Sequence, residues 1–360
     1  MIRVVFVPGP ALSGKDRIEM AKKWIYWFDE IGSDFNDLVG KKCANLGEMT
    51  KLGMKVPPGF AISVDGYEQF MEESGAAKEI QSYFHENRAM MSLVGKQVEA
   101  SREICRIIES KSLPKEMAQE LRHSYETLCH QVGIPDLAVA VRSSGAVSMP
   151  GQMETYLNVR GKSELERKVT QVWASAFTAR AIAFRLEKNM DIAKAPIGVA
   201  VLKMVNAKCA GVVLTVQPTT GNLNKVVVEG NWGLGESVVS GEITPDQFIV
   251  DKASGSCETT ISPKNKMVCY GQVGTRVAEV PKHLQCEACL APDELSEIVR
   301  IATDVENYFN LPQDMEWVID QDLPFPENIY WVQARPAKYS KVEQDESVYL
   351  ADLMSRIFRM

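Results

Sequence analysis

The sequence predicts an α+β protein in two lobes, the first rich in helices and the second rich in strands. A chain of 360 residues is too long for one small hydrophobic core, so we expect two packed units. Residues 65–131 show apolar positions at helical spacing, and residues 163–189 predict one long amphipathic helix. Beyond Pro196 the pattern changes to short β-branched runs separated by Gly, Pro and Asn, which favours strands.

Four segments follow from these changes in pattern. We expect an N-terminal extension over residues 1–23, a first lobe over 24–196, a second lobe over 197–336 and a tail helix over 337–360. The tail has apolar residues at helical spacing, and it either covers its own domain or docks on a partner. Met1 together with this tail favours a complete polypeptide over an excised fragment.

The overall composition argues against several classes of function. A net charge of −7 argues against general binding of nucleic acid or anionic membranes. No apolar run is long enough for a membrane-spanning helix or a signal peptide, so we expect a cytoplasmic protein. The 8 cysteines are scattered, which favours reduced thiols over a disulfide framework. The tight pair Cys286 and Cys289, with His283 before it, is a candidate for metal chemistry, but its spacing indicates no fourth ligand.

The loop over residues 142–155 is a candidate anion-binding site. A short apolar run ends at Arg142, small and hydroxyl residues including Gly151 follow, and Thr155 precedes a second apolar run. Small residues let backbone N–H groups approach an anion closely, and the arginine supplies a fork that suits phosphate oxygens. The alternative is an ordinary hairpin connection with a surface arginine.

A second basic group follows Gly40, which can make a tight entry into a helix. The apolar residues Leu46, Met49 and Leu52 recur at helical spacing after it. A lysine in the first turn of such a helix lies beside backbone N–H groups that already favour anions. Lys41 and Lys42 both fit this position, and the alternative is that they are ordinary surface lysines.

Two alternating strands near the end of the chain predict a site for a hard cation. They lie around Glu316 and Gln333, and a turn with Pro324 and Pro326 joins them. Their pairing can set Glu316 and Gln333 as cross-strand neighbours on one face, where a carboxylate and an amide oxygen suit magnesium. Arg335 would share that face and could reach a phosphate. The alternative is a half-buried hairpin with polar residues facing water.

Together these stretches resemble the N-terminal, ATP-binding part of phosphoenolpyruvate synthase and pyruvate phosphate dikinase, a module shared with rifampicin phosphotransferase. The resemblance runs from about residue 24 to 336. The segments that show the resemblance occur in the same order as in the family: VGKKCANLGEM, PPGFAI, AVRSSGAVSMPGQMETYLNV, VWASAFTARAIAFR, AGVVLT, WGLGESVVSGEITPDQF, DMEWVID and WVQARP. It implies an ATP-grasp-like fold in which ATP and Mg²⁺ lie in a cleft between two α+β lobes.

The resemblance also assigns residues by position. It matches the first-lobe phosphate residues of the family to Lys42, Arg142, Gly151 and Thr155, and the second-lobe metal and phosphate residues to Glu316, Gln333 and Arg335. Lys42, Arg142 and Arg335 would then stabilise the transferred phosphates, while Glu316 and Gln333 would bind the metal. Two positions depart from the family: Lys41 replaces a usual glycine, and Leu202 stands where a glutamine often lies near the adenine.

The family passes phosphate from ATP to a histidine in a Gly-Gly-x-x-Ser/Thr-His setting on another domain. His85, His123, His130 and His283 all lack that setting. The chain is therefore similar to the smaller ATP-binding subunit of phenylphosphate synthase, whose partner carries the histidine. This resemblance implies pyrophosphoryl transfer from ATP to a partner subunit, with AMP and phosphate as products and phenol as acceptor. The alternatives are part of a phosphoenolpyruvate synthase or a rifampicin phosphotransferase-like enzyme, and a nucleotide-binding regulator without turnover.

Overall fold

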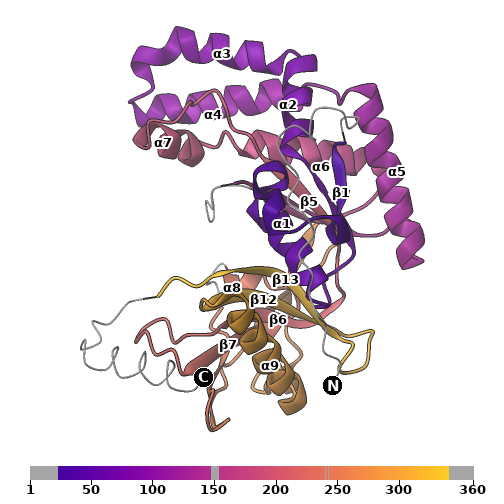
Figure 1. The fold of residues 1–360 in the computed structure, drawn as a ribbon, viewed down its shortest axis with the longest axis vertical. Helices are drawn as coiled ribbons and strands as arrows, with labels where there is room; N and C mark the ends of the chain where they lie inside the picture. Colours follow the sequence, from indigo (N-terminus) through magenta and orange to yellow (C-terminus); the bar gives the residue numbers. More distant parts are fainter. Residues whose placement is uncertain (1–22, 147–153, 240, 242, 340–360) are drawn as a thin grey trace.

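A computed structural model describes residues 23–146, 154–239, 241 and 243–339 of the chain. Two lobes lie one above the other, with helix α1 (Asn36–Lys51) between them (Figure 1). This arrangement confirms the predicted α+β class and the helix-rich first and strand-rich second lobe. The predicted extension and tail lie almost entirely outside the described residues.

The first lobe is built on a five-stranded antiparallel sheet in the order β1-β2-β5-β3-β4. Its strands are β1 (Ile25–Trp27), β2 (Gly59–Ile62), β3 (Val139–Ser144), β4 (Thr155–Val159) and β5 (Gly198–Lys203). Branched side chains such as Val141 and Val201 pack one face into a helical core. The smaller Ala140 and Ala200 line the other face, which belongs to the core around α1. The small side chains leave room for that helix.

In the described part of the first lobe, six α-helices cover the sheet face away from α1 (Figure 1). They are α2 (Val64–Glu73), α3 (Ala76–Asn87), α4 (Val94–Glu109), α5 (Lys115–Val132), α6 (Lys162–Ser175) and α7 (Ala179–Glu187). Trp173 of α6 is fully buried at their centre, with its ring centroid 4.8 Å from that of Phe70. The helical prediction for residues 65–131 is confirmed. One-turn 3-10 helices occupy Phe28–Glu30, Ser33–Phe35 and Arg88–Met90.

The second lobe has a six-stranded antiparallel sheet in the order β13-β12-β6-β7-β8-β9. Its strands are β6 (Ala207–Leu214), β7 (Lys225–Trp232), β8 (Asp246–Asp251), β9 (Cys257–Thr260), β12 (Gln313–Asp320) and β13 (Ile329–Pro336). Helix α9 (Pro292–Phe309) covers one face with Ile298, Ala302 and Val305, which recur at helical spacing. The remaining elements are α8 (Glu236–Val239), a 3-10 turn (Lys282–Leu284) and a two-stranded ribbon of β10 (Lys266–Tyr270) and β11 (Thr275–Glu279).

Two sequence predictions are wrong in detail. Strand β5 pairs with β2 and β3, so residues 198–203 belong to the first sheet and the chain crosses to the second lobe at residues 204–206, later than the predicted boundary at 196. A β-branched run has the same appearance in either sheet, so its pattern does not reveal its partner. The single helix over residues 163–189 is two helices, because the Thr178 side chain accepts a hydrogen bond from the Ala181 backbone and starts α7 afresh.

The predictions for thiols and membrane spans can be compared with the described residues. All eight cysteines are free, as expected, with Cys286 exposed and Cys289 buried. In the described part of the chain, no group of three His, Cys, Asp or Glu side chains is placed to hold a metal ion. No helix among the described ranges is both long and apolar enough to cross a bilayer.

Candidate functional site

Arg142, in the second half of β3, reaches from the first lobe to the second. Its Nη2 donates to Glu316 Oε2 at 3.0 Å and to Gln333 Oε1 at 3.3 Å, and its Nη1 donates to the Val332 carbonyl at 3.1 Å. The Arg142 side chain is 16% exposed and that of Glu316 is 18% exposed, so this ion pair is little screened by water. The predicted front-half arginine and back-half carboxylate–amide pair therefore meet in space.

Glu316 and Gln333 are direct cross-strand partners on β12 and β13, which confirms the predicted register. A bulge follows Glu316, so that the next pair is Trp317 with Trp331, and Val332 is the extra residue. The bulge turns the Val332 carbonyl into a partner for Arg142. The roles of Glu316 and Gln333 as metal ligands remain a prediction.

Lys42 lies beside this cluster because of an unusual backbone at Gly40. Gly40 interrupts α1 with a φ of 76°, and a Cβ there would lie 1.9 Å from the Ser144 carbonyl oxygen. The Lys41 N–H donates to the Gly145 carbonyl at 3.0 Å, and the Cys43 N–H donates to Ser144 Oγ at 3.0 Å. These bonds fix the turn of α1 that follows Gly40 against the end of β3, two residues after Arg142.

The pKa of Lys42 is lowered to about 8. Burial disfavours its charged form most, and the positive charges of Arg142 and Arg335 lower the pKa further, whereas Glu316 opposes them. Among the described residues Lys42 forms no ion pair, so its ammonium lacks a close carboxylate. An anion placed beside Arg142 would therefore stabilise the charged form of Lys42.

Arg335 lies two residues from Gln333, and Asp314 holds it. Arg335 Nε and Nη2 contact Asp314 Oδ2 at 2.8 and 2.7 Å, and these residues are cross-strand partners. The Arg335 side chain is 42% exposed, so part of the guanidinium faces solvent. Asp314 was not predicted as a site residue, although it lies two positions from Glu316 on the same strand. The period of two is the signal that could have found it.

Thr155 is exposed and is the cross-strand partner of Arg142 on the neighbouring strand β4. Gly151, the other predicted residue of this loop, lies outside the described residues. Leu202, discussed for adenine contact, is buried in the core next to α1.

The cluster has the chemistry that a nucleotide and its metal need. Arg142 Nε is buried and has no hydrogen-bond partner among the described residues, which leaves a donor for an anion oxygen. Glu316 and Gln333 offer one carboxylate and one amide oxygen side by side, the hard ligands that Mg²⁺ prefers. The residues therefore fit both a phosphate group and a magnesium ion.

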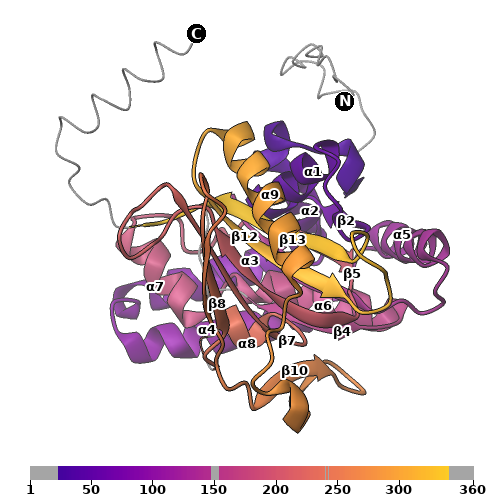
Figure 2. The ribbon, with the colours of Figure 1, turned by 90° about the horizontal axis from the view of Figure 1, so that it is seen from below.

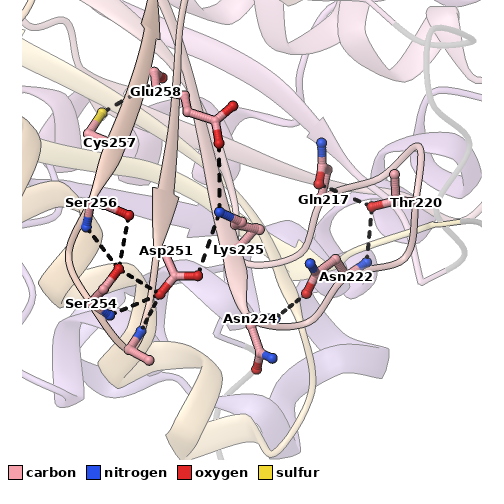
Figure 3. Close-up of polar contacts among 11 residues, drawn as sticks. Gln217, Thr220, Asn222, Asn224, Lys225, Asp251, Ser254, Ser256, Cys257 and Glu258 are labelled. Atoms are coloured by element: carbon pink, nitrogen blue, oxygen red, sulfur yellow. Dashed lines mark hydrogen bonds and ion pairs between the residues drawn. The ribbon is translucent and has the colours of Figure 1, made fainter.

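Sequence reasoning missed two polar residues of the second sheet, Glu229 and Gln247, which lie in register with Glu316 beyond the apolar Val212. In register, Glu316 lies opposite Val212, Val212 opposite Glu229, and Glu229 opposite Gln247. Gln247 Nε2 donates to Glu229 Oε1 at 2.8 Å, which places both side chains on one face. At the far end of β7, Lys225 pairs with Asp251 and Glu258 (Figure 3).

Two cavities lie away from this cluster. One of 560 Å³ is lined by α4, α5 and α6, and one of 500 Å³ lies between the end of α1, α9 and the turn before β13. None of their lining residues is a predicted site residue. At the predicted site the two lobes are instead in contact through Arg142.

Comparisons with known proteins identify relatives of the chain. Residues 36–353 match the family model described as "Pyruvate phosphate dikinase, AMP/ATP-binding domain". A phosphoenolpyruvate synthase of Aeropyrum pernix is 37% identical, covering 91% of this chain and 44% of its own length. A probable phosphoenolpyruvate synthase of Methanothermobacter thermautotrophicus is 38% identical, with 87% and 46% covered. The chain thus spans less than half the length of these relatives.

Similarity to solved structures is low. A biotin carboxylase complex from Campylobacter jejuni aligns with a TM-score of 0.28 at 11% identity, over 62% of this chain and 35% of that one. The fold assignment therefore depends on the observed sheets and helices alone. The family match covers most of the chain, and the chain belongs to the family of the pyruvate phosphate dikinase AMP/ATP-binding domain.

Proposed function

We propose that this chain is the ATP-binding component of a dikinase-type phosphotransferase and that it acts together with a histidine-bearing partner subunit. The observation that carries the proposal is the contact of Arg142 from the first lobe with both Glu316 and Gln333 from the second. Lys42 adds a cation without an ion pair in the described part of the chain. These groups belong to the part of the chain that matches an AMP/ATP-binding family.

The residues have distinct tasks in this proposal. Glu316 and Gln333 would hold Mg²⁺, which supplies charge neutralisation between the phosphates. Lys42, Arg142 and Arg335 bind the β- and γ-phosphates and spread the charge that grows during transfer. Arg142 must exchange its bonds to Glu316 and Gln333 for bonds to phosphate, so nucleotide binding rearranges this contact between the lobes.

The reaction requires no nucleophile from this chain. A neutral imidazole nitrogen of the partner attacks the β-phosphorus, forming an N–P bond as the bond from that phosphorus to the AMP oxygen breaks. AMP leaves, and water then releases inorganic phosphate from the pyrophosphorylated histidine. The remaining phosphoryl group passes to phenol, giving phenylphosphate and free imidazole.

Pyruvate is the second candidate acceptor. The relatives that match this chain are named phosphoenolpyruvate synthases. Their name supports the same transfer from ATP to histidine, followed by transfer from phosphohistidine to pyruvate in place of phenol. In both cases the acceptor is selected outside this chain, because phosphohistidine is the common donor. A rifampicin phosphotransferase-like acceptor belongs to the same class.

The test mixes the purified chain with a candidate partner and ATP labelled at the β- or γ-phosphate. We expect the β label on a partner histidine and then on phenol, and the γ label in inorganic phosphate. Transfer to pyruvate but not phenol would select the second candidate. ATP binding without AMP formation under all partner conditions would indicate a regulator. Label on His85, His123, His130 or His283 would contradict the partner requirement.

A further inference from the structure

The ribbon of β10 and β11 belongs to neither large sheet, yet it contacts both lobes. Figure 2 shows β10 next to β4. At the tip of the ribbon, Asn158 Nδ2 of β4 donates to the carbonyls of Gly271 and Gly274 at 3.0 and 2.9 Å. The two amide hydrogens of one first-lobe side chain thus hold the turn of a second-lobe hairpin.

The surroundings of Asn158 fix its side-chain amide in the orientation that this contact needs. It is 5% exposed, and its backbone has a φ of 54°, a conformation that asparagine tolerates better than most residues. Arg160 Nε donates to Asn158 Oδ1 at 3.2 Å, and Arg160 Nη1 donates to the Asp136 carbonyl at 3.0 Å. The amide is therefore bonded through its oxygen and both of its hydrogens, with the two donors directed at the ribbon.

Two further hydrogen bonds hold the ribbon against the rest of the molecule. The Tyr270 hydroxyl donates to the Val205 carbonyl at 2.8 Å, in the segment where the chain crosses between the lobes. In the middle of β10, the Val268 carbonyl accepts a hydrogen bond from the Leu234 N–H at 2.8 Å. Gly233 approaches that carbonyl so closely that a Cβ would lie 2.2 Å from the oxygen. The ribbon therefore contacts β4, the crossing segment and the Gly233–Gly235 loop.

The first of these contacts lies close in the chain to the cluster of the proposed function. Asn158 lies three residues after Thr155, the cross-strand partner of Arg142. We propose that Asn158 is a positioning residue, which through the ribbon holds the two lobes at the spacing that lets Arg142 and Lys42 act on the same phosphates as Glu316 and Gln333. This inference depends on the proposed function. With a looser ribbon, part of the protein population would adopt lobe arrangements that cannot bind nucleotide from both lobes. The apparent ATP affinity would fall in proportion to the fraction of molecules that remain competent to bind.

Asn158→Asp is the sharpest variant, because it keeps the shape, the backbone preference and the oxygen that accepts from Arg160 but removes both donors. The matched control is Asn189→Asp. Asn189 has a φ of 52° and is exposed, and its described side chain makes no bond to the second lobe. Tyr270→Phe loosens the same ribbon at the crossing segment and serves as a second variant if Asn158→Asp fails to fold.

Two readouts are measured on the full chain: amide hydrogen exchange and equilibrium binding of Mg-ATP. In Asn158→Asp we expect faster exchange over residues 266–279 and at the Trp331 amide, which donates across the lobes to the Lys55 carbonyl at 2.9 Å. We also expect about tenfold weaker ATP binding, with Asn189→Asp unchanged in both measurements.

The outcomes separate the two hypotheses. Faster ribbon exchange with unchanged Trp331 exchange and unchanged ATP affinity would overturn the inference, because the contact would then be purely local. Unchanged ribbon exchange would overturn it as well. If the wild-type chain binds no ATP, the proposed function fails, whereas coupled exchange at the ribbon and Trp331 would still show that Asn158 restrains the lobes.

Discussion

Arg142 on β3 and Glu316 on β12 form an ion pair of 3.0 Å although 174 residues separate them in the chain. The same guanidinium also contacts Gln333, so one cation holds both side chains that are predicted to bind the metal. In the proposed function, this ion pair neutralises the carboxylate before nucleotide binds, and the carboxylate becomes available when phosphate replaces it as the partner of Arg142. Glu316 is therefore the residue whose loss should have the clearest effect.

Under the proposed function, Glu316→Ala is expected to lower AMP formation at least about 100-fold, because the proposed carboxylate ligand of the metal and the partner of Arg142 are both removed. The side chain is half-buried at the lobe contact and outside the main core, so the circular dichroism spectrum should stay unchanged. Glu327→Ala, an exposed glutamate on the turn before β13, is the control and should retain full activity. Undiminished AMP formation by Glu316→Ala with partner present would exclude its role.

ATP affinity should fall as pH rises past the pKa of Lys42, which is about 8 in the free chain. Phosphate stabilises the ammonium and raises this pKa, so binding takes up a proton above about pH 7. Between about pH 7 and pH 9.5 we expect a loss of affinity on the order of tenfold, measured by titration calorimetry in buffers of different ionisation enthalpy.

Adjacent lysines provide the control for this pH dependence. Lys42→Met should bind ATP more weakly and show no proton uptake on binding. Lys41 is exposed, so Lys41→Met should keep the ATP affinity and the proton uptake of the unchanged chain. Equal behaviour of the two variants would contradict the assignment of Lys42.

Gly40→Ala should destabilise the fold by about 3 kcal/mol or more, because it combines a left-handed backbone with a clash against the Ser144 carbonyl. Gly53 has the same φ of 76°, but a Cβ added there would meet nothing within 4 Å, so Gly53→Ala should cost only about 1 kcal/mol. Urea unfolding of both variants measures the difference. Equal losses would show that the close approach to Ser144 has no energetic effect.

Lys264→Met should be strongly destabilising. Lys264 and Asp246 form a fully buried ion pair of 2.6 Å, and removing the lysine leaves a buried carboxylate that still accepts hydrogen bonds from the Ser262 and Cys289 N–H groups but has lost its cation. We expect a loss of about 3 kcal/mol. Lys225→Met removes the longer, partly exposed pairs with Asp251 and Glu258 and should cost less than about 1 kcal/mol. Thermal unfolding that ranks the two variants in the opposite order would contradict this.

The parts of the site that sequence could predict are those set by local periodicity. The alternation of β12 and β13 allowed Glu316 and Gln333 to be cross-strand neighbours, and the observed register of this hairpin confirms that pairing. The glycine before Lys42 likewise indicated a tight entry to α1, and its φ of 76° confirms it.

The parts that sequence did not predict depend on contacts between distant segments. Strand β5 lies between β2 and β3, both far earlier in the chain, and its β-branched pattern does not identify those partners. The Asn158 contact with Gly271 and Gly274 is set by a left-handed backbone and a neighbouring lobe, and no periodicity encodes either. Glu229 was missed because its place in the same row as Glu316 follows from the strand order of the whole sheet.

Helix α1 has a consequence for how this protein can be divided. Its buried residues Val39, Leu46 and Met49 share one continuous apolar core with Ala200 of the first sheet and with Trp317 of the second. A recombinant fragment ending at the crossing segment would leave that core open to water and invite aggregation. Swapping one lobe for that of a relative would also require matching side chains on α1, so members of this family should exchange both lobes together.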